Sequence, residues 1–116
     1  MSNTETFKLS RPIKTHGGEI DTLTLREPTA GAFVDNGEPF KVVTKANAEG
    51  EPSGIDIIYD NNRALLRFIV DMVVEKVDEI VLKGLTAADF MRLRGLATNI
   101  ILVGIGPKDP TAPSVG

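Results

Sequence analysis

The sequence predicts an α+β fold, with an N-terminal β-hairpin packed on a small C-terminal helical bundle and a second hairpin left open between them. Three observations predict it. Apolar and polar residues alternate around a Gly-Gly turn within residues 6–26, apolar residues recur at helical spacing over 60–82, and a helix-start motif follows at Thr86. A chain of 116 residues is enough for one domain, which we place at residues 1–104, before a disordered tail at 105–116.

Two half-buried strands flank the predicted turn. Apolar and polar residues alternate over 7–10 and again over 22–26, the period of a strand with one buried face. The glycines at 17–18 accept positive φ at little cost, which favours a tight turn. Pro12 lacks an N–H, so its strand is expected at a sheet edge. Residues 1–5 are expected to form a loose tail.

The middle of the chain has weaker patterns. Thr29 is predicted to cap a short helical turn. Residues 40–44 and 55–59 are rich in β-branched and aromatic side chains and flank a stretch with glycine and proline at 49–54. Two alternatives follow. Either these segments form a second hairpin, or the region is a long mobile loop that feeds the next helix.

One continuous helix is predicted over residues 60–82, and it should be the core helix of the domain. Asp60 or Asn61 can cap its first turn, and Gly84 provides a stop. Its valines and isoleucines lower the intrinsic helix propensity, so packing must hold the helix together. The predicted apolar face comprises Leu65, Leu66, Ile69, Met72, Val73, Val77 and Ile80.

Acidic residues at four-residue spacing mark one flank of this predicted helix. Asp71, Glu75 and Glu79 would repel one another mildly, and Arg67 would relieve only the first. A solvated acidic stripe is the favoured interpretation. The alternative is that these three side chains bind a basic segment of a partner.

A second helix is predicted to begin at Thr86. Its hydroxyl is placed to cap the first turn, and Asp89 three residues later resembles the partner in a capping box. The short connection makes the two helices neighbours. The expected buried face comprises Phe90, Leu93, Ala97, Ile100 and Ile101, with Arg92, Thr98 and Asn99 facing away.

No motif for catalysis, a metal or a cofactor emerges from the sequence. The chain has no cysteine, and its one histidine, His16, sits in the predicted turn, where a solvated side chain is the favoured interpretation. A net charge of −3 with mixed signs gives no nucleic-acid footprint. The polar N-terminus and the short apolar runs predict neither a signal peptide nor a membrane span.

The segment F-K-L-S-R-P-I-K-T-H-G-G-E-I-D-T-L-T-L-R-E-P-T-A-G resembles the opening of the small tail assembly chaperones of Mu-like and related contractile-tailed phages. The family signature is matched by Pro12-Ile13, the glycine pair, and the stretch from Leu25 to Gly31. The helix start from Leu85 to Phe90 is also similar. Two departures stand out: Ala32 replaces an acid expected after the signature, and residues 34–59 exceed the usual spacer.

The resemblance implies a non-enzymatic role in a bacteriophage or prophage. Such chaperones hold the aggregation-prone tape measure protein soluble in the host cytoplasm while tail tube subunits assemble around it, and then leave. A longer frameshifted product is also common in these phages. A structural tail component that stays in the virion is the alternative, and an enzyme with an unrecognised site is a third hypothesis.

Arg26 and Glu27 form the candidate partner-binding centre within the signature. Pro28 keeps Glu27 extended, so the two side chains point to opposite faces and are not expected to pair with each other. Each therefore needs another partner. Either they clamp the hairpin onto the helices, or at least one is exposed at the rim of a groove that binds the tape measure protein.

Overall fold

The first two strands form the expected hairpin. The computed structural model describes residues 3–105, and in it β1 (Thr4–Thr15) pairs antiparallel with β2 (Gly18–Arg26). Of the tail expected to be disordered at 105–116, only Ile105 is described, and it is bonded to Glu27 and Asn3; the rest lies outside the described residues. Gly18 has φ 117°, a conformation that favours glycine, and it begins the returning strand. The loose tail expected at 1–5 is wrong from the fourth residue onward, because the strand already pairs there.

A register shift in β1 explains how this strand accommodates proline. The shift lies between Lys8 and Ile13, where residues 9–12 correspond to the single residue Asp21 in β2. Pro12 lies in this bulge, so its missing N–H removes no regular ladder bond. The inward apolar side chains stay buried on both sides of the irregularity.

The second hairpin is confirmed, and the mobile-loop alternative is wrong. β3 (Lys41–Ala46) pairs antiparallel with β4 (Pro52–Ile58). Its turn begins at Asn47, earlier than the sequence indicated, because the Asn47 carboxamide accepts hydrogen bonds from the N–H groups of Glu49 and Glu51 at 3.0 and 2.9 Å. Such side-chain bonds to nearby backbone stabilise a turn.

The single long helix expected next is wrong: the structure divides it into α2 (Asn62–Met72) and α3 (Glu79–Lys83). After Met72 the chain becomes extended at Val73, which bridges to β2, and the Val74 N–H donates to the Thr24 C=O at 2.8 Å. β-Branched valines suit this extended pairing better than a helix interior. Strand pairing therefore interrupts the helical pattern.

Because the helix is interrupted, the buried residues differ from those predicted for one continuous helix. Asn61 caps α2 by accepting from the Ala64 N–H at 3.1 Å, and Asp78 caps α3 by accepting from the Val81 N–H at 2.9 Å. Ile80, expected on the buried face, is 78% exposed. The buried members of the predicted face are Leu65, Leu66, Ile69, Met72 and Val73.

The remaining helices begin near the predicted caps. Thr29 precedes α1 (Ala30–Asn36), but its side chain makes no cap hydrogen bond. Thr86 does cap α4 (Ala87–Val103), accepting from the Asp89 N–H at 3.1 Å.

Thr98, expected on the exposed side of α4, is buried. Its hydroxyl donates to the Arg94 C=O at 2.8 Å and shares a 2.7 Å hydrogen bond with the Tyr59 hydroxyl. These bonds satisfy its polar atom, so burial is possible. Because its single proton goes to Arg94, Tyr59 is the donor in the second bond.

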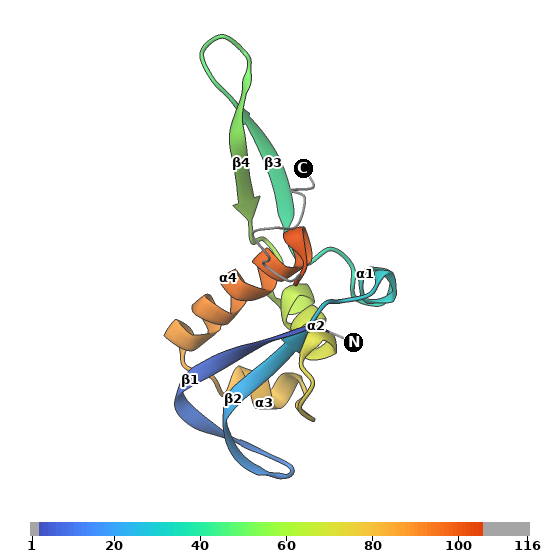
Figure 1. Cartoon of the computed structure of the whole chain (residues 1–116), viewed down its shortest axis with the longest axis vertical. Coiled ribbons are helices and arrows are strands. Elements are labelled where there is room, and N and C mark those ends of the chain that lie inside the picture. Colours follow the sequence, from blue (N-terminus) through green and yellow to red (C-terminus); the bar gives the residue numbers. More distant parts are fainter. Residues whose placement is uncertain (1–2, 106–116) are drawn as a thin grey trace, which may run out of the picture.

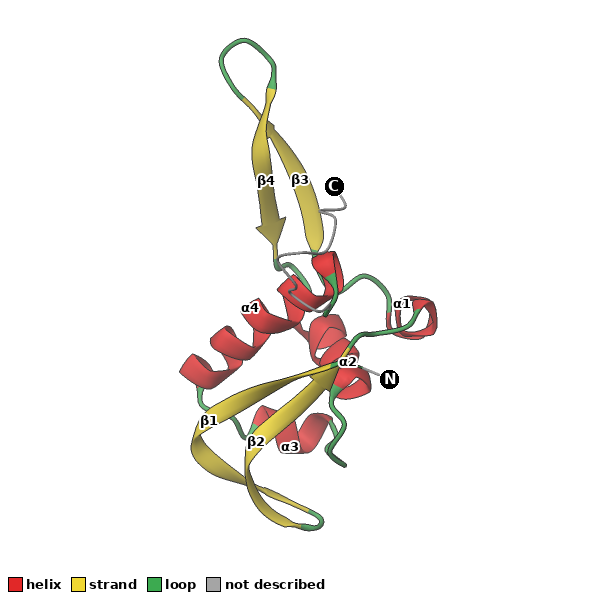
Figure 2. Cartoon of the chain, viewed as in Figure 1, coloured by secondary structure: helices red, strands yellow, loops and turns green. Residues whose placement is uncertain are grey.

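The two hairpins extend in opposite directions from the helices (Figure 1), and Figure 2 shows α2 and α4 between them. Leu23, Phe68 and Leu93 are fully buried where the first hairpin meets the helices. The second hairpin projects away from this core, and the radius of gyration of 16.0 Å exceeds the roughly 13 Å typical of a compact chain of this length. No helix within residues 3–105 has the length and apolar character to cross a membrane.

Candidate partner-binding surfaces

Arg26 connects the end of β2 to the end of α2. Its Nε and Nη2 groups donate to the Asp71 C=O at 3.4 and 3.3 Å. The last carbonyls of a helix lack intrahelical partners, and a cation near them is favourable. The Asp71 side chain accepts from Asn36 Nδ2 at 2.6 Å, which ties α1 to the same point.

Glu27 connects the other side of the same junction to the end of α4. Its carboxylate accepts the backbone N–H of Ile105, and the Asn3 side chain donates to the Ile105 C=O at 2.8 Å. Gly104 has φ 78°, and a Cβ atom there would lie 2.5 Å from Glu27 Oε1. A glycine at this position therefore allows the carboxylate to approach.

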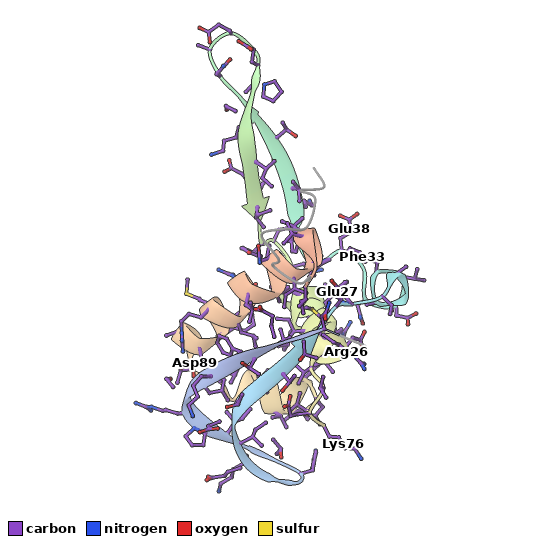
Figure 3. All side chains as sticks on the ribbon, in the orientation of Figure 1. Arg26, Glu27, Phe33, Glu38, Lys76 and Asp89 are labelled. Carbon is purple, nitrogen blue, oxygen red and sulfur yellow. The ribbon has the colours of Figure 1, made fainter. Side chains whose placement is uncertain are left out.

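Arg26, Glu27 and Asp71 line one polar recess of about 430 Å³, together with Thr29 and Asp35. Figure 3 shows Arg26 and Glu27 beside α2, where β2 ends. Both side chains belong to exposed residues and both have partners within the chain. The structure thus supports the clamp alternative and also leaves both groups accessible, while the partner-binding role stays a prediction.

The acidic stripe expected over Asp71, Glu75 and Glu79 is wrong, because the chain leaves the helix before Glu75. Glu75 accepts from the Thr24 N–H and hydroxyl, both at 2.7 Å. Glu79 accepts from Arg67 at 2.8 Å, so Arg67 relieves the third acid rather than the first. Each of the three carboxylates is bonded to a group within the chain. Repulsion among them therefore no longer argues that they bind a basic segment of another protein.

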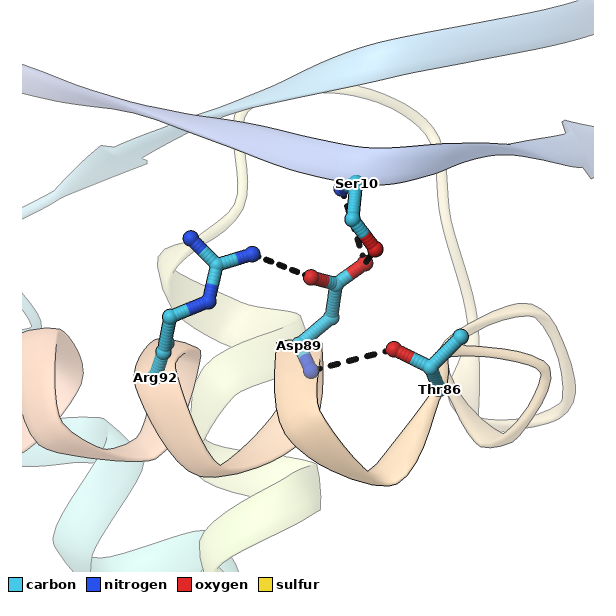
Figure 4. Close-up of polar contacts among 4 residues, drawn as sticks. All are labelled: Ser10, Thr86, Asp89 and Arg92. Carbon is cyan, nitrogen blue, oxygen red and sulfur yellow. Dashed lines mark hydrogen bonds and ion pairs between the residues drawn. The ribbon is translucent and has the colours of Figure 1, made fainter.

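Asp89 is a buried carboxylate. The sequence predicted its place in a helix cap but not its bonds to β1. It is 1% exposed and accepts from the Ser10 N–H at 3.0 Å and the Ser10 hydroxyl at 2.9 Å (Figure 4). Its other oxygen accepts from Arg92. The capping pattern found Thr86, but the expected partner bonds β1 instead of closing a capping box. Only the fold brings Ser10 to this helix end.

The environment of Asp89 determines its charge state. Burial alone would raise the pKa of the carboxyl, but the hydrogen bonds from the Ser10 hydroxyl, Arg92 and the Ser10 N–H outweigh burial and lower the pKa. The carboxylate is therefore charged at neutral pH. This buried ionised group fixes the start of α4 against β1.

An open groove of about 490 Å³ lies between α2, α3 and α4. Its apolar lining consists of Leu66, Leu82, Leu85 and Phe90, with Ala87 at the edge. The break after α2 allows Leu82 of α3 to lie beside Leu66 of α2. The sequence indicated only a broad apolar surface here, because its helical period runs through both helices without an interruption.

The second hairpin exposes further apolar side chains. Val42, Val43, Ile55 and Ile58 are exposed on its strands. Its base is held by Tyr59, which bonds Thr98 of α4 and lies 4.0 Å from the Arg94 guanidinium. A two-stranded hairpin is only marginally stable by itself in water. The contacts of Tyr59 with α4 therefore stabilise the base of the projecting hairpin.

His16 lies in the exposed turn as expected, with Nε2 3.4 Å from the Asp78 carboxylate. Residues 3–105 contain no cluster of three or more histidine, cysteine or acidic side chains placed to hold a metal ion.

Comparison with known proteins identifies one match. The family described as "Phage tail assembly chaperone proteins, E, or 41 or 14" matches residues 6–101. No curated protein and no solved structure matches the chain. The matched residues run from β1 into α4 and include the polar recess, the groove and both hairpins.

Proposed function

Because the chain belongs to the family of phage tail assembly chaperone proteins, we propose that it binds the tape measure protein and keeps it soluble while the tail assembles. The role is non-catalytic. It is carried out in the host cytoplasm, and the chaperone leaves before the tail is complete. Tail tube subunits are a further class of partner in this proposal.

The open groove between α2, α3 and α4 is the observation that supports this function best. A protein that exposes apolar helix faces before assembly aggregates unless a complementary surface covers them. The groove is lined by Leu66, Leu82, Leu85 and Phe90, of which Leu85 and Phe90 are partly exposed. This surface is suited to temporary capture, because it is open to solvent and needs no covalent step.

The polar recess at Arg26, Glu27 and Asp71 is a second contact surface in this proposal. Its exposed charged groups suit polar residues of the same partner. Glu75 and Glu79 have weaker support, because each is satisfied by Thr24 or Arg67 within the chain.

Co-purification tests the proposal. An affinity-tagged chain is co-expressed with the tape measure protein of the same phage, and the eluate is quantified by mass spectrometry. We expect the tape measure protein in the eluate at a defined ratio to the chain, and not with the tag alone. Its absence, when the tagged chain is folded and the tape measure protein is present in the lysate, would refute the proposal.

A structural tail component is the second candidate, and the projecting hairpin favours it. Exposed β-branched residues on a ribbon, such as Val42 and Ile55, are typical of surfaces that assembly covers. Mass spectrometry of purified virions beside infected lysate separates the two candidates. A chaperone is abundant in the lysate and depleted from virions, whereas a structural component is retained at a fixed copy number.

A further inference from the structure

The charged residues that line the apolar groove are all cations. Two cations, Arg63 and Lys83, lie among its lining residues, and none of the lining residues is acidic. Neither cation forms a salt bridge in the part of the chain that the structure describes. The chain as a whole has a net charge of −3, so this is a locally basic surface on an acidic protein.

The neighbouring polar groups strengthen the basic character of the groove. Asn62, at one end, accepts a hydrogen bond from Arg94 Nη1 at 3.2 Å. Arg94 also lies 6.0 Å from the Phe90 ring, which lines the groove. The carboxylates closest in sequence to the lining residues are Asp60, Glu79 and Asp89. Each is bonded elsewhere: Asp60 to Lys41, Glu79 to Arg67, and Asp89 to Ser10 and Arg92.

The walls of the groove determine the backbone form of its occupant. They come from the N-terminal turns of α2 and α4, from α3, and from Leu85 between α3 and α4, and none of them belongs to a strand. An extended segment would therefore find no strand edge there to pair with its backbone. A helix satisfies its backbone internally and presents a row of side chains to the apolar floor.

We propose that the groove binds an amphipathic helix whose apolar face is bordered by acidic residues. This inference rests on the proposed function, since it assigns the chemical class of the segment that the chaperone captures. Leucine-type side chains of that helix contact the partly exposed Leu85 and Phe90, while its carboxylates lie against the exposed Arg63 and Lys83. The basic rim selects acidic helices and disfavours basic ones.

Two synthetic peptides test this inference. Both carry the same leucine face at helical spacing, and they differ only in having glutamate or lysine beside it. Fluorescence anisotropy measures their binding to the full chain. We expect the glutamate peptide to bind about tenfold more tightly, because two exposed charge contacts change from attraction to repulsion in the lysine peptide. Equal binding of the two peptides, or binding of neither, overturns the inference.

Two charge-reversal variants of the chain, one inside the groove and one outside it, provide a matched comparison. Arg63→Glu with Lys83→Glu should invert the preference, whereas Lys14→Glu with Lys76→Glu changes the net charge equally, at exposed residues outside the groove lining, and should leave the preference intact. Thermal melts confirm that both variants fold. A preference that is unchanged by the groove variant, or lost equally in both variants, contradicts the assignment.

The tape measure protein itself separates this inference from the proposed function. Capture reduced only by the groove variant supports both. Capture that is equal for wild type and groove variant overturns the inference and leaves the proposed function standing. Failure of the wild type to capture the protein refutes the function, and the peptides still decide the chemistry of the groove. Dimerisation that the groove variant abolishes would instead assign the groove to a second copy of this chain.

Discussion

At the scale of single residues, carboxylates join the parts of this protein. Asp89 connects α4 to β1 through Ser10, Glu75 connects the extended segment after α2 to Thr24, and Glu27 connects β2 to the end of α4. Each of these acids accepts a backbone N–H from a distant part of the chain. Bonds of this kind specify orientation, because a charge-assisted hydrogen bond is lost when its partner is misplaced.

Asp89 gives a prediction about pH. Because its folded pKa is lowered, its charge stabilises the fold above the ordinary pKa of an aspartate, and this stabilisation is lost as the pH falls through the folded pKa. The asparagine side chain of the Asp89→Asn variant cannot ionise. We expect its melting temperature to be lower than that of the wild type at about pH 7, and the difference to shrink below about pH 4. Thermal melts of both proteins across this pH range measure the difference in melting temperature.

Asp21→Asn is the control for this experiment. Asp21 also has a lowered pKa, through a hydrogen bond and attraction from Lys8, but its side chain is exposed. Its substitution should change the melting temperature little at any pH. A difference for Asp89→Asn that stays constant down to the lowest pH would contradict the charged-carboxylate account.

Arg26 and Glu27 give a second prediction at this scale. Arg26→Ala leaves the Asp71 C=O without its donor, and Glu27→Ala leaves the Ile105 N–H without its acceptor. Each should destabilise the fold by about 0.5–1.5 kcal/mol. If the polar recess contacts the partner, capture of the tape measure protein should fall further than the loss of folded protein explains.

Lys14→Ala, an exposed site outside the recess, is the control for both measurements. Capture that declines only in proportion to unfolding would leave Arg26 and Glu27 as a structural clamp.

At the scale of elements, the sequence predicted those features that depend on interactions between residues close together in the chain. The alternation in β1 and β2, the glycine turn, and the caps at Asn61 and Thr86 are set by neighbouring residues, and all are confirmed. The break after α2 depends on Val74 meeting Thr24, a contact between segments distant in sequence. The helical period continued through this region without a glycine or proline, and the local signals present, the Val73-Val74 pair and the Asp78 cap, were too weak to predict the break.

The same distinction applies to the candidate surfaces. The signature around Arg26 was visible in the sequence, but its bonds to Asp71 and Ile105 were not. The groove required the break between α2 and α3, and its cations, Arg63 and Lys83, are far apart in sequence. Ser10 gave no sign of its bond to Asp89, because serine in a strand is common on a solvated face.

The second hairpin gives an element-scale prediction. Val42 and Ile57 are paired in its register, so residues 43–56 can be replaced by Asn-Gly, a sequence that favours a two-residue turn. The removed residues are exposed, whereas the base at Phe40 and Tyr59 is retained. We expect the shortened chain to keep a cooperative thermal transition near that of the full chain.

Circular dichroism and differential scanning calorimetry compare the shortened and full-length chains. Loss of the cooperative transition would mean that the hairpin is part of the core, contrary to its exposed strands.

At the scale of the whole molecule, we predict that the first hairpin and the helices form one cooperative unit. Neither a two-stranded ribbon nor an isolated short helix is stable without packing. Ile69→Asp places a charge at a fully buried position and should cost more than about 3 kcal/mol, abolishing the folding transition. Val34→Asp is the matched control at a residue that is 83% exposed, and it should melt like the wild type. A sharp transition for Ile69→Asp near that of the wild type would contradict the fold.

The measurement closest to the central claim is the solubility of the tape measure protein. It is expressed alone, with the wild-type chain, and with the unfolded Ile69→Asp variant, and its fraction in the supernatant is quantified after sedimentation. We expect the tape measure protein to aggregate alone and with the variant, and to form a soluble complex with the wild type. A tape measure protein that is equally soluble under all three conditions, or that aggregates despite abundant folded chain, would contradict the chaperone function.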